Sequence, residues 1–505
     1  MSTRVRQAFQ SAAGAAGGGQ SYFTEIYRDS SSTTNTAQAQ NDGGCWAKSA
    51  NYFFRGTNIY NLNGDSQGDP VIMRMDNNGV IDKYCSVNVT GSGVNGNLNN
   101  QVPMAILPIS DDEVLQCLRV GVSSSSPWYQ TLGNAFAIQK VDVAGQSLDT
   151  HRVWWWRDTT FYAGNFHFVG ATRVGVDNNF FLFVARQQNN IWNLLVKIND
   201  SGAVVWDYGF KPNGGLQIAE AGGIDNDGTY LYIAHAGEGA SPQGSYLTVL
   251  DGSGSSTPST VASKVSFNNQ RNQQARIAVD ADNDFAYVMD SSADGNVTQW
   301  DISTPSNPTV NWRRVLSTGA SPTWVGRDLI PDGSGNILLC SRYQVNPWTP
   351  AAILWNLSGT DGTDNFKNAY ETTSGYQYGK GNYMPYSENH RSGSFQVIDG
   401  TVYLPYNVRQ TTSGQNTSGS LVVPVDGSLT STSAMSVGGA HYYKTYSAYT
   451  ASNTSTTVSS LSDGSISFGA ASNIGNWRNS TTNTTGNFIS QSSLGSITQT
   501  RVDIS

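Results

Sequence analysis

Residues 195–206, LVKINDSGAVVW, contain the pattern that decides the fold of this chain. An apolar run precedes Asn199, a glycine follows at Gly202, and a second apolar run ends at Trp206. Short apolar runs separated by Asx-Gly turns are signals of β-hairpins. The segment therefore predicts two antiparallel strands joined by a tight turn.

The same pattern occurs seven times along the chain, at spacings of 66, 57, 52, 50, 55 and 70 residues. A repeat of this size that is built only of strands is typical of β-propellers, in which four-stranded sheets pack around an axis. The repeated positions are Asp76, Asp142, Asn199, Asp251, Asp301, Asn356 and Asp426.

The pattern predicts an all-β chain with three parts. Residues 1–44 are a Gly/Ala-rich arm, residues 45–437 a seven-bladed β-propeller, and residues 438–505 a Ser/Thr/Asn-rich β segment. We expect residues 21–27 to form a strand that becomes ordered against a neighbouring subunit, because Gly-rich termini rarely order alone. The C-terminal segment is either a separate β appendage, which we favour, or an eighth degenerate blade paired with residues 21–27.

The composition excludes several classes of protein. Charged residues make up 13% of the chain and the net charge is -8, whereas a nucleic-acid binder needs a concentrated basic face. No apolar stretch approaches the length of a membrane span, and the N-terminus lacks the apolar core of a secretory signal. We expect the protein to be made in a cytoplasm, with its cysteines reduced and mostly buried.

The repeat at residues 195–206 resembles the propeller repeats of the PQQ-like and SBBP type, and the resemblance covers roughly residues 45–435. It implies a propeller fold. The tryptophan of a quinoprotein repeat is present at Trp206 but absent from most other copies, so we expect no quinone cofactor.

No motif predicts catalysis or a metal site. The turns at 225–228 and 280–284 resemble the start of a calcium loop, but both lack the Gly and Glu that complete it. The histidines are scattered and no GxSxG motif occurs. We therefore expect no catalytic residue, no metal and no cofactor, and a protein that is not an enzyme.

Three consecutive tryptophans are the one candidate for ligand binding. On a strand, Trp154 and Trp156 share one face and Trp155 lies on the other. Trp154 and Trp156 are candidate glycan-stacking residues, because aromatic rings offer a flat apolar surface to a sugar. The alternative is that all three rings pack between blades.

The combination of a propeller, a Gly-rich arm and a nearly uncharged tail resembles a structural protein of a tailed-bacteriophage virion, from its tail, nozzle, baseplate or fibre. That resemblance implies a symmetric homo-oligomer that contacts other virion proteins through residues 1–44 and 438–505, without nucleic acid or a membrane span. The alternatives are an adhesin that binds a host surface glycan or receptor and, less favoured, a propeller enzyme such as a quinoprotein or lyase.

Overall fold

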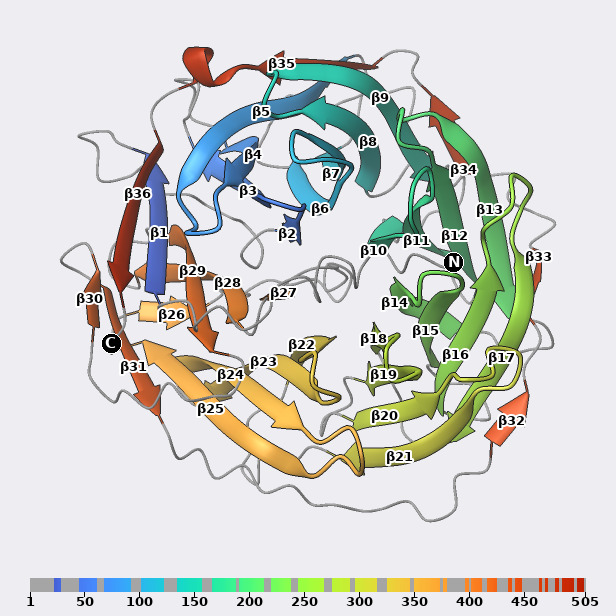
Figure 1. The fold of residues 1–505 in the computed structure, drawn as a ribbon. Helices are drawn as coiled ribbons and strands as arrows, with labels where there is room; N and C mark the ends of the chain where they lie inside the picture. The colour runs from blue at the N-terminus through green and yellow to red at the C-terminus, as the bar shows by residue number, and fades with distance from the viewer. Residues whose placement is uncertain are drawn as a thin grey trace.

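The structure is a computed structural model, and its described strands form a ring of antiparallel sheets (Figure 1). The described residues are 22–28, 45–60, 68–91, 101–121, 134–156, 166–187, 190–212, 219–237, 244–267, 275–290, 296–315, 325–345, 349–372, 376–378, 396–398, 401–410, 416–424, 435–437, 441–446, 463–465, 468–470, 477–480, 484–494 and 497–503. This part of the chain contains no α-helix, and none of its elements has the helical length and hydropathy of a membrane span.

Six sheets each take four consecutive strands of the chain, as the repeat predicts. Sheet 1 comprises β2 (Cys45–Lys48), β3 (Phe53–Tyr60), β4 (Gly68–Met75) and β5 (Ile81–Gly91). Sheet 2 comprises β6 (Val102–Pro108), β7 (Glu113–Gly121), β8 (Asn134–Asp142) and β9 (Ser147–Trp156). Sheet 3 comprises β10 (Phe166–Arg173), β11 (Asn179–Gln187), β12 (Asn190–Ile198) and β13 (Val204–Pro212).

The later sheets repeat this order. Sheet 4 comprises β14 (Ala219–Asn226), β15 (Leu231–Gly237), β16 (Gly244–Asp251) and β17 (Ser259–Phe267). Sheet 5 comprises β18 (Ala275–Asp280), β19 (Phe285–Asp290), β20 (Asn296–Asp301) and β21 (Thr309–Val315). Sheet 6 comprises β22 (Val325–Pro331), β23 (Ile337–Val345), β24 (Thr349–Leu357) and β25 (Asp364–Thr372).

Sheet 7 combines strands from both ends of the chain. It contains β26 (Tyr376–Tyr378), β27 (Gln396–Ile398), β28 (Thr401–Gln410) and β29 (Asn416–Pro424), and then β1 (Tyr22–Arg28) and β36 (Ile497–Asp503). The inner strands β6, β10, β14, β18, β22 and β27 contact one another in succession, and β1 contacts β3 of sheet 1. The architecture is all-β and fits a β-propeller, which confirms the predicted fold class at that level.

In sheets 1 to 5 the repeated Asp or Asn caps the turn between the third and fourth strands. The Asp76 carboxylate accepts hydrogen bonds from the backbone N–H groups of Asn78 and Val80, each at 2.9 Å. Gly79 completes the turn at a φ of 75°, a conformation that glycine adopts without steric cost. Asn199 caps the corresponding turn of sheet 3 by accepting from the N–H of Ala203 at 2.8 Å. The repeated Asp or Asn is therefore a turn cap, which explains its recurrence.

The sixth repeat differs from the predicted alignment by two residues. The turn cap of sheet 6 is Ser358, whose hydroxyl accepts from the N–H of Thr360 at 3.2 Å. Asn356 lies before the register shift of its hairpin, and its side-chain amide donates to Asp332 at 2.9 Å. The prediction failed there because Asn and Ser are both turn formers and the sequence offers both within two positions.

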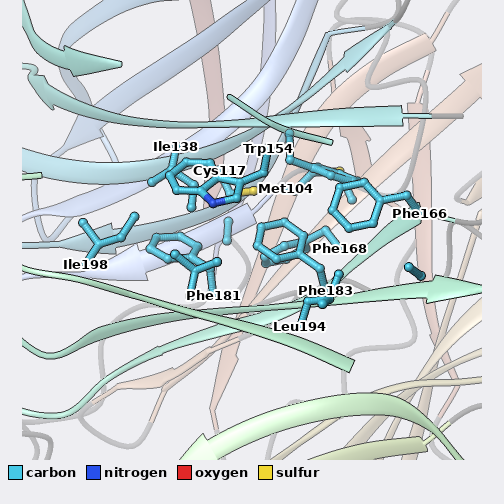
Figure 2. Close-up of a cluster of buried hydrophobic side chains, with 14 of the residues drawn as sticks. Met104, Cys117, Ile138, Trp154, Phe166, Phe168, Phe181, Phe183, Leu194 and Ile198 are labelled. Carbon is cyan, nitrogen blue, oxygen red and sulfur yellow. The ribbon is translucent and has the colours of Figure 1, made fainter. Parts of the chain in front are cut away.

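The core lies between successive sheets. Figure 2 shows one such layer, where aromatic side chains of sheets 2 and 3 interlock. The ring centroids of Phe136 and Phe166 are 5.2 Å apart in an edge-to-face arrangement, and those of Phe166 and Phe183 are 5.5 Å apart. Such pairs stabilise a fold by about 0.5–1.5 kcal/mol each beyond their area burial. A sheet with two apolar faces requires a neighbour on each side, which is why the repeat recurs.

The N-terminal strand closes the ring. Residues of β1 pair on one side with β29, where Tyr22 opposes Val422, and on the other side with β36, where Tyr22 opposes Asp503. We expected the strand to order on a neighbouring subunit, whereas it pairs within its own chain. A pairing with the C-terminal segment, which belonged only to the less favoured alternative of an eighth blade, is present between β1 and β36. Residues 1–21 and 29–44 of the predicted arm lie outside the described part of the chain.

The described strands of residues 435–503, called the C-terminal strap below, lie at the outer edges of sheets 6, 4, 3, 2, 1 and 7 (Figure 1). It pairs in turn with β25, β17, β13, β9, β5 and β1, and so meets the sheets in the reverse of their chain order. Its elements are β30 (Met435–Val437), β31 (His441–Tyr446), β32 (Asp463–Ser465), β33 (Phe468–Ala470), β34 (Trp477–Ser480), β35 (Thr484–Ile489), the 3-10 turn η2 (Gln491–Ser493) and β36.

This arrangement differs from both the expected appendage and the expected eighth blade. Several strap strands have only three or four residues, too few to form a stable sheet of their own. Added to existing edges, they pair N–H and C=O groups that would otherwise be open to another chain.

Candidate functional site

The candidate glycan platform predicted from the tryptophans is not assembled at Trp154. Trp154 is 0% exposed and packs in the core between sheets 2 and 3 (Figure 2). Its ring has no open face for a sugar. Trp155 is partly buried against a neighbouring apolar cluster. The backbone of Trp156 pairs with that of Trp477 in the strap, and the Trp156 side chain lies outside the described residues.

The most developed polar site is the seam between sheets 3 and 4. Lys197 on β12 is 3% exposed and reaches across the seam. Its ammonium donates to the carbonyl oxygens of Gly252, Ser253 and Gly254 at 3.0, 3.2 and 2.9 Å. The indole N–H of Trp206 donates to the same Gly254 carbonyl at 3.4 Å. The turn of sheet 4 is thus held by two side chains of sheet 3.

Burial lowers the pKa of Lys197, and the nearby Asp251 carboxylate opposes that effect. All three ammonium hydrogens have carbonyl partners, so the side chain holds a backbone turn and presents no lone pair for attack on a substrate. The ring of Phe180 lies 5.7 Å from the ammonium and adds a cation–π contact. Lys197 is therefore a structural cation.

A cavity of about 200 Å³ opens at the same seam. Phe180 and Leu231 supply apolar surface, while Asn178, Thr229 and Ser253 supply amide and hydroxyl groups. None of its lining residues is titratable, so this cavity offers hydrogen bonds and apolar contact but no general acid or base.

The seam between sheets 5 and 6 repeats the clasp with different residues. The Gln299 side-chain amide donates to the carbonyl oxygen of Gly359 at 2.6 Å, and the indole N–H of Trp312 donates to it at 3.1 Å. Gln299 and Trp312 are register partners, as Lys197 and Trp206 are. At both seams, a polar residue on the third strand and a tryptophan on the fourth strand of one sheet therefore donate hydrogen bonds to a turn of the following sheet.

A third polar system crosses sheet 2. Gln116, Gln139 and His151 occupy matching positions on β7, β8 and β9. Gln116 donates to the Gln139 carbonyl oxygen at 2.6 Å, and the Gln139 amide nitrogen lies 3.2 Å from Nδ1 of His151. Nε2 of His151 lies 3.1 Å from the hydroxyl of Thr484 in the strap. Burial lowers the pKa of His151 to about 4.

The two calcium-like turns hold their carboxylates in hydrogen bonds with the protein. Asp227 accepts from the N–H groups of Thr229 and Tyr230 at 2.8 and 2.7 Å. Asp225 accepts from the N–H of Val279 in the next sheet at 2.9 Å. These turns act as hairpin caps and as a link between sheets. Within the described residues, no group of three His, Cys, Asp or Glu side chains has the arrangement of a metal site.

The described cysteines Cys45, Cys85 and Cys117 are buried free thiols. Burial raises the pKa of the Cys85 and Cys117 thiols, which keeps them protonated and unreactive. The side chain of Cys340 lies outside the described residues.

The polar residues that link the sheets were missed by the sequence analysis. Lys197 and Gln299 both stand two residues before the repeated Asp or Asn. A comparison of that position across the repeats finds Arg74 and Lys140 as well, and both of these make ion pairs. Polar side chains at a fixed position of a buried strand were the available signal.

No family model and no curated protein matches the chain. Among solved structures, it is similar to the phage phi92 endosialidase, with 8% identity, a TM-score of 0.36, and coverage of 80% of this chain and 69% of that one. It is similar to the polysaccharide lyase Uly1, with 10% identity, a TM-score of 0.43, and coverage of 84% and 96%. It is also similar to the WD40 domain of SCAP from fission yeast, with 13% identity, a TM-score of 0.31, and coverage of 84% and 97%.

The expectation that the chain is not an enzyme is corrected by this comparison. Two of the similar structures, an endosialidase and a polysaccharide lyase, are enzymes by name. Sequence reasoning had inferred the absence of catalysis from the absence of local motifs. Propellers assemble sites from several loops, so local motifs do not decide the question.

Proposed function

We propose that the chain is a structural component of a tailed-bacteriophage virion, in the tail, nozzle, baseplate or fibre, and that its ring is a seven-bladed propeller. The single observation that supports this best is the C-terminal strap. The strap strands pair with the outer strands of six sheets, and the last described strand pairs with the first. Such a ring suits a building block that must persist outside a cell, because the first and last described strands are both paired within a sheet.

We further propose that the assembly contacts lie in residues 1–44 and 438–505. The strap strands form much of the outer wall of the ring (Figure 1). The strap strands β32, β33, β34, β35 and β36 are each the last described strand of their sheet, so the same segment can bind the chain's own sheets and a neighbouring subunit. A symmetric homo-oligomer and other virion proteins are the partners that this surface would take.

The test is co-purification with particles. Virions are banded on a density gradient, washed in high salt and digested for mass spectrometry, and antibodies against the chain are used in immunogold microscopy. We expect the chain at constant stoichiometry in the band and gold label at the tail. Recovery of the chain only in the soluble lysate contradicts the proposal.

A deletion separates folding from assembly. Removal of residues 1–20 keeps β1 and every sheet, so we expect an unchanged melting temperature and loss of incorporation into particles. Normal incorporation of this variant would remove the arm from the proposed contacts.

A further inference from the structure

The strand β35 of the strap bridges two sheets. It pairs with β5 of sheet 1 from Thr484 opposite Gly91 to Ile489 opposite Ser86. Its other face packs on β9 of sheet 2, where a Cβ added to Gly486 would lie 2.4 Å from Leu148 and 3.3 Å from His151. The strap is thus wedged at this seam, and beside the pairing of β34 with β9 its contacts with sheet 2 include Leu148, His151 and a hydrogen bond from the N–H of Gln491 to the side-chain oxygen of Gln146 at 2.8 Å.

The directions of the hydrogen bonds between the Gln116, Gln139 and His151 side chains fix the tautomer of His151. Gln139 uses its carbonyl oxygen to accept from Gln116 at 2.6 Å, so its NH₂ group faces Nδ1 of His151. Nδ1 must then accept, and the single ring proton of the neutral imidazole sits on Nε2. That proton is donated to the hydroxyl of Thr484, which is 8% exposed. The bond from Gln139 to Nδ1 therefore requires a neutral imidazole, whereas the bond from Nε2 to Thr484 can be donated by either form.

A second proton on His151 opposes this arrangement. Protonated Nδ1 would present an N–H to the NH₂ group of Gln139, a donor facing a donor. To relieve the clash, both glutamine amides must reverse, and Gln116 then loses the bond from its nitrogen to the carbonyl of Val87 on β5. Protonation at one end of the chain thus disturbs the contact of sheet 2 with sheet 1 at the other end.

The charged groups around His151 belong to sheet 2 itself. Lys140 on β8 pairs with Glu113 on β7 at 2.7 Å and with Asp149 on β9 at 3.2 Å. Arg152 follows His151 on β9. Neither β35 nor the part of β5 that it pairs with contains a titratable residue. An acid-induced change at this seam therefore originates in the imidazole or in the Lys140 cluster.

We propose that the chain Gln116–Gln139–His151–Thr484 is a pH-sensitive latch that holds β35 of the strap against sheet 2 and releases it when His151 takes up a proton. This inference goes beyond the proposed virion role and does not depend on it. The depressed pKa of the buried imidazole agrees with the geometry, because release returns His151 to water, where its ordinary pKa is 6.5.

The direction of the pH dependence follows from the linkage between proton binding at His151 and release of β35. Released His151 binds protons more readily than latched His151, so the latch weakens as the pH falls from about 6.5 to about 4 and its loss levels off below that. The same relation predicts that the equilibrium constant of the latched over the released state is on the order of 30-fold smaller at pH 5.0 than at pH 7.5.

The test is hydrogen exchange of the full chain at pH 7.5 and pH 5.0, with rates corrected for intrinsic pH dependence. We expect protection of the amides in β35 to fall about 30-fold at pH 5.0, with β11 and β12 of sheet 3 unchanged. The matched variant is His151→Gln, whose side chain accepts and donates in the same directions and does not titrate. It should keep β35 protected at pH 5.0, whereas parallel loss in both proteins assigns the effect to the Lys140 cluster and overturns the proposal.

A second measurement needs no variant. In wild-type protein labelled with ¹³C,¹⁵N-histidine, His151 should show the Nε2–H tautomer at neutral pH and a pKa well below 6.5. A resonance set in which all five histidines titrate at or above their ordinary range would refute the latch.

Discussion

The ammonium of Lys197 lies 3.0 Å from the carbonyl oxygen of Gly252, across the seam between sheets 3 and 4. The bond joins the third strand of one repeat to the turn of the next. It makes the seam depend on polar contacts as well as on apolar packing, and its removal has a calculable effect.

Replacement of Lys197 by Met keeps most of the apolar stem and leaves the buried carbonyl of Gly252 without its donor, while Gly254 keeps the indole N–H of Trp206. Buried acceptors without a donor cost about 1–3 kcal/mol, so we expect the free energy of unfolding to fall by that amount. Denaturant titration measures it. Lys264→Met is the control, because Lys264 makes an exposed bond to Asn307 and should change stability by less than about 0.5 kcal/mol.

Substitution by alanine should destabilise the fold at one glycine and be neutral at another glycine of an equivalent turn. A Cβ on Gly359 would lie 1.8 Å from the carbonyl oxygen of Gly335, so the backbone must shift. We expect Gly359→Ala to destabilise the fold by about 1–3 kcal/mol. At Gly254 the nearest atom would be 3.5 Å away, an ordinary contact, and Gly254→Ala should be close to neutral. Equal melting temperatures for the two variants would contradict the turn geometry.

Two buried aspartates of the same turn type should differ in the sign of their effect. Burial raises the pKa of Asp280, so its ionised form is disfavoured in the fold. Its contribution to stability falls as the pH rises through the ordinary aspartate range, and Asp280→Asn should raise the melting temperature at pH 7.

For Asp332, burial alone would raise the pKa, but hydrogen bonds from Asn356, Asn336 and Ser334 outweigh it and the net shift is downward. This carboxylate stabilises the fold above its ordinary pKa, and that contribution is lost as the pH falls. Asp332→Asn should lower the melting temperature at pH 7, and the difference from the wild type should shrink as the pH falls toward 3. A calorimetric series from pH 3 to pH 7 on both variants decides the signs.

The N-terminal strand can be tested against the arm that precedes it. Deletion of residues 1–28 removes β1 from between β29 and β36 and opens the ring. We expect a lower melting temperature and faster proteolysis than for the deletion of residues 1–20, which leaves β1 in place. If both deletions melt alike, β1 does not close the ring in solution.

The repeat in the sequence predicted most of the fold because its turn residues act locally. Asp76 and Asn199 bond to backbone groups two to four residues away, and such contacts leave a signal within one segment. The short apolar runs likewise predicted a strand on each side of the turn. The alignment of the sixth repeat on Asn356 was wrong because Asn356 and Ser358 are both turn-forming residues within one segment.

The strap and the seam contacts could not be predicted in the same way. The pairing of β33 with β13 joins residues far apart in the chain, and no property of Phe468 or Gly469 names its partner. The latch residue His151 looked like one scattered histidine among five because its two partners, Gln139 and Thr484, lie on other strands. Long-range contacts of this kind follow from the fold and leave no local pattern.

The strand order of sheet 7 also determines when β1 can pair while the chain is being synthesised. The ribosome makes β1 before any other described strand, yet both of its ladder partners, β29 and β36, belong to the last part of the chain to emerge. The strand must wait without its ladder while the intervening sheets form, and pairings this distant in sequence fold slowly. The moment at which the first described strand acquires its structure is therefore governed by the synthesis of β29 and β36.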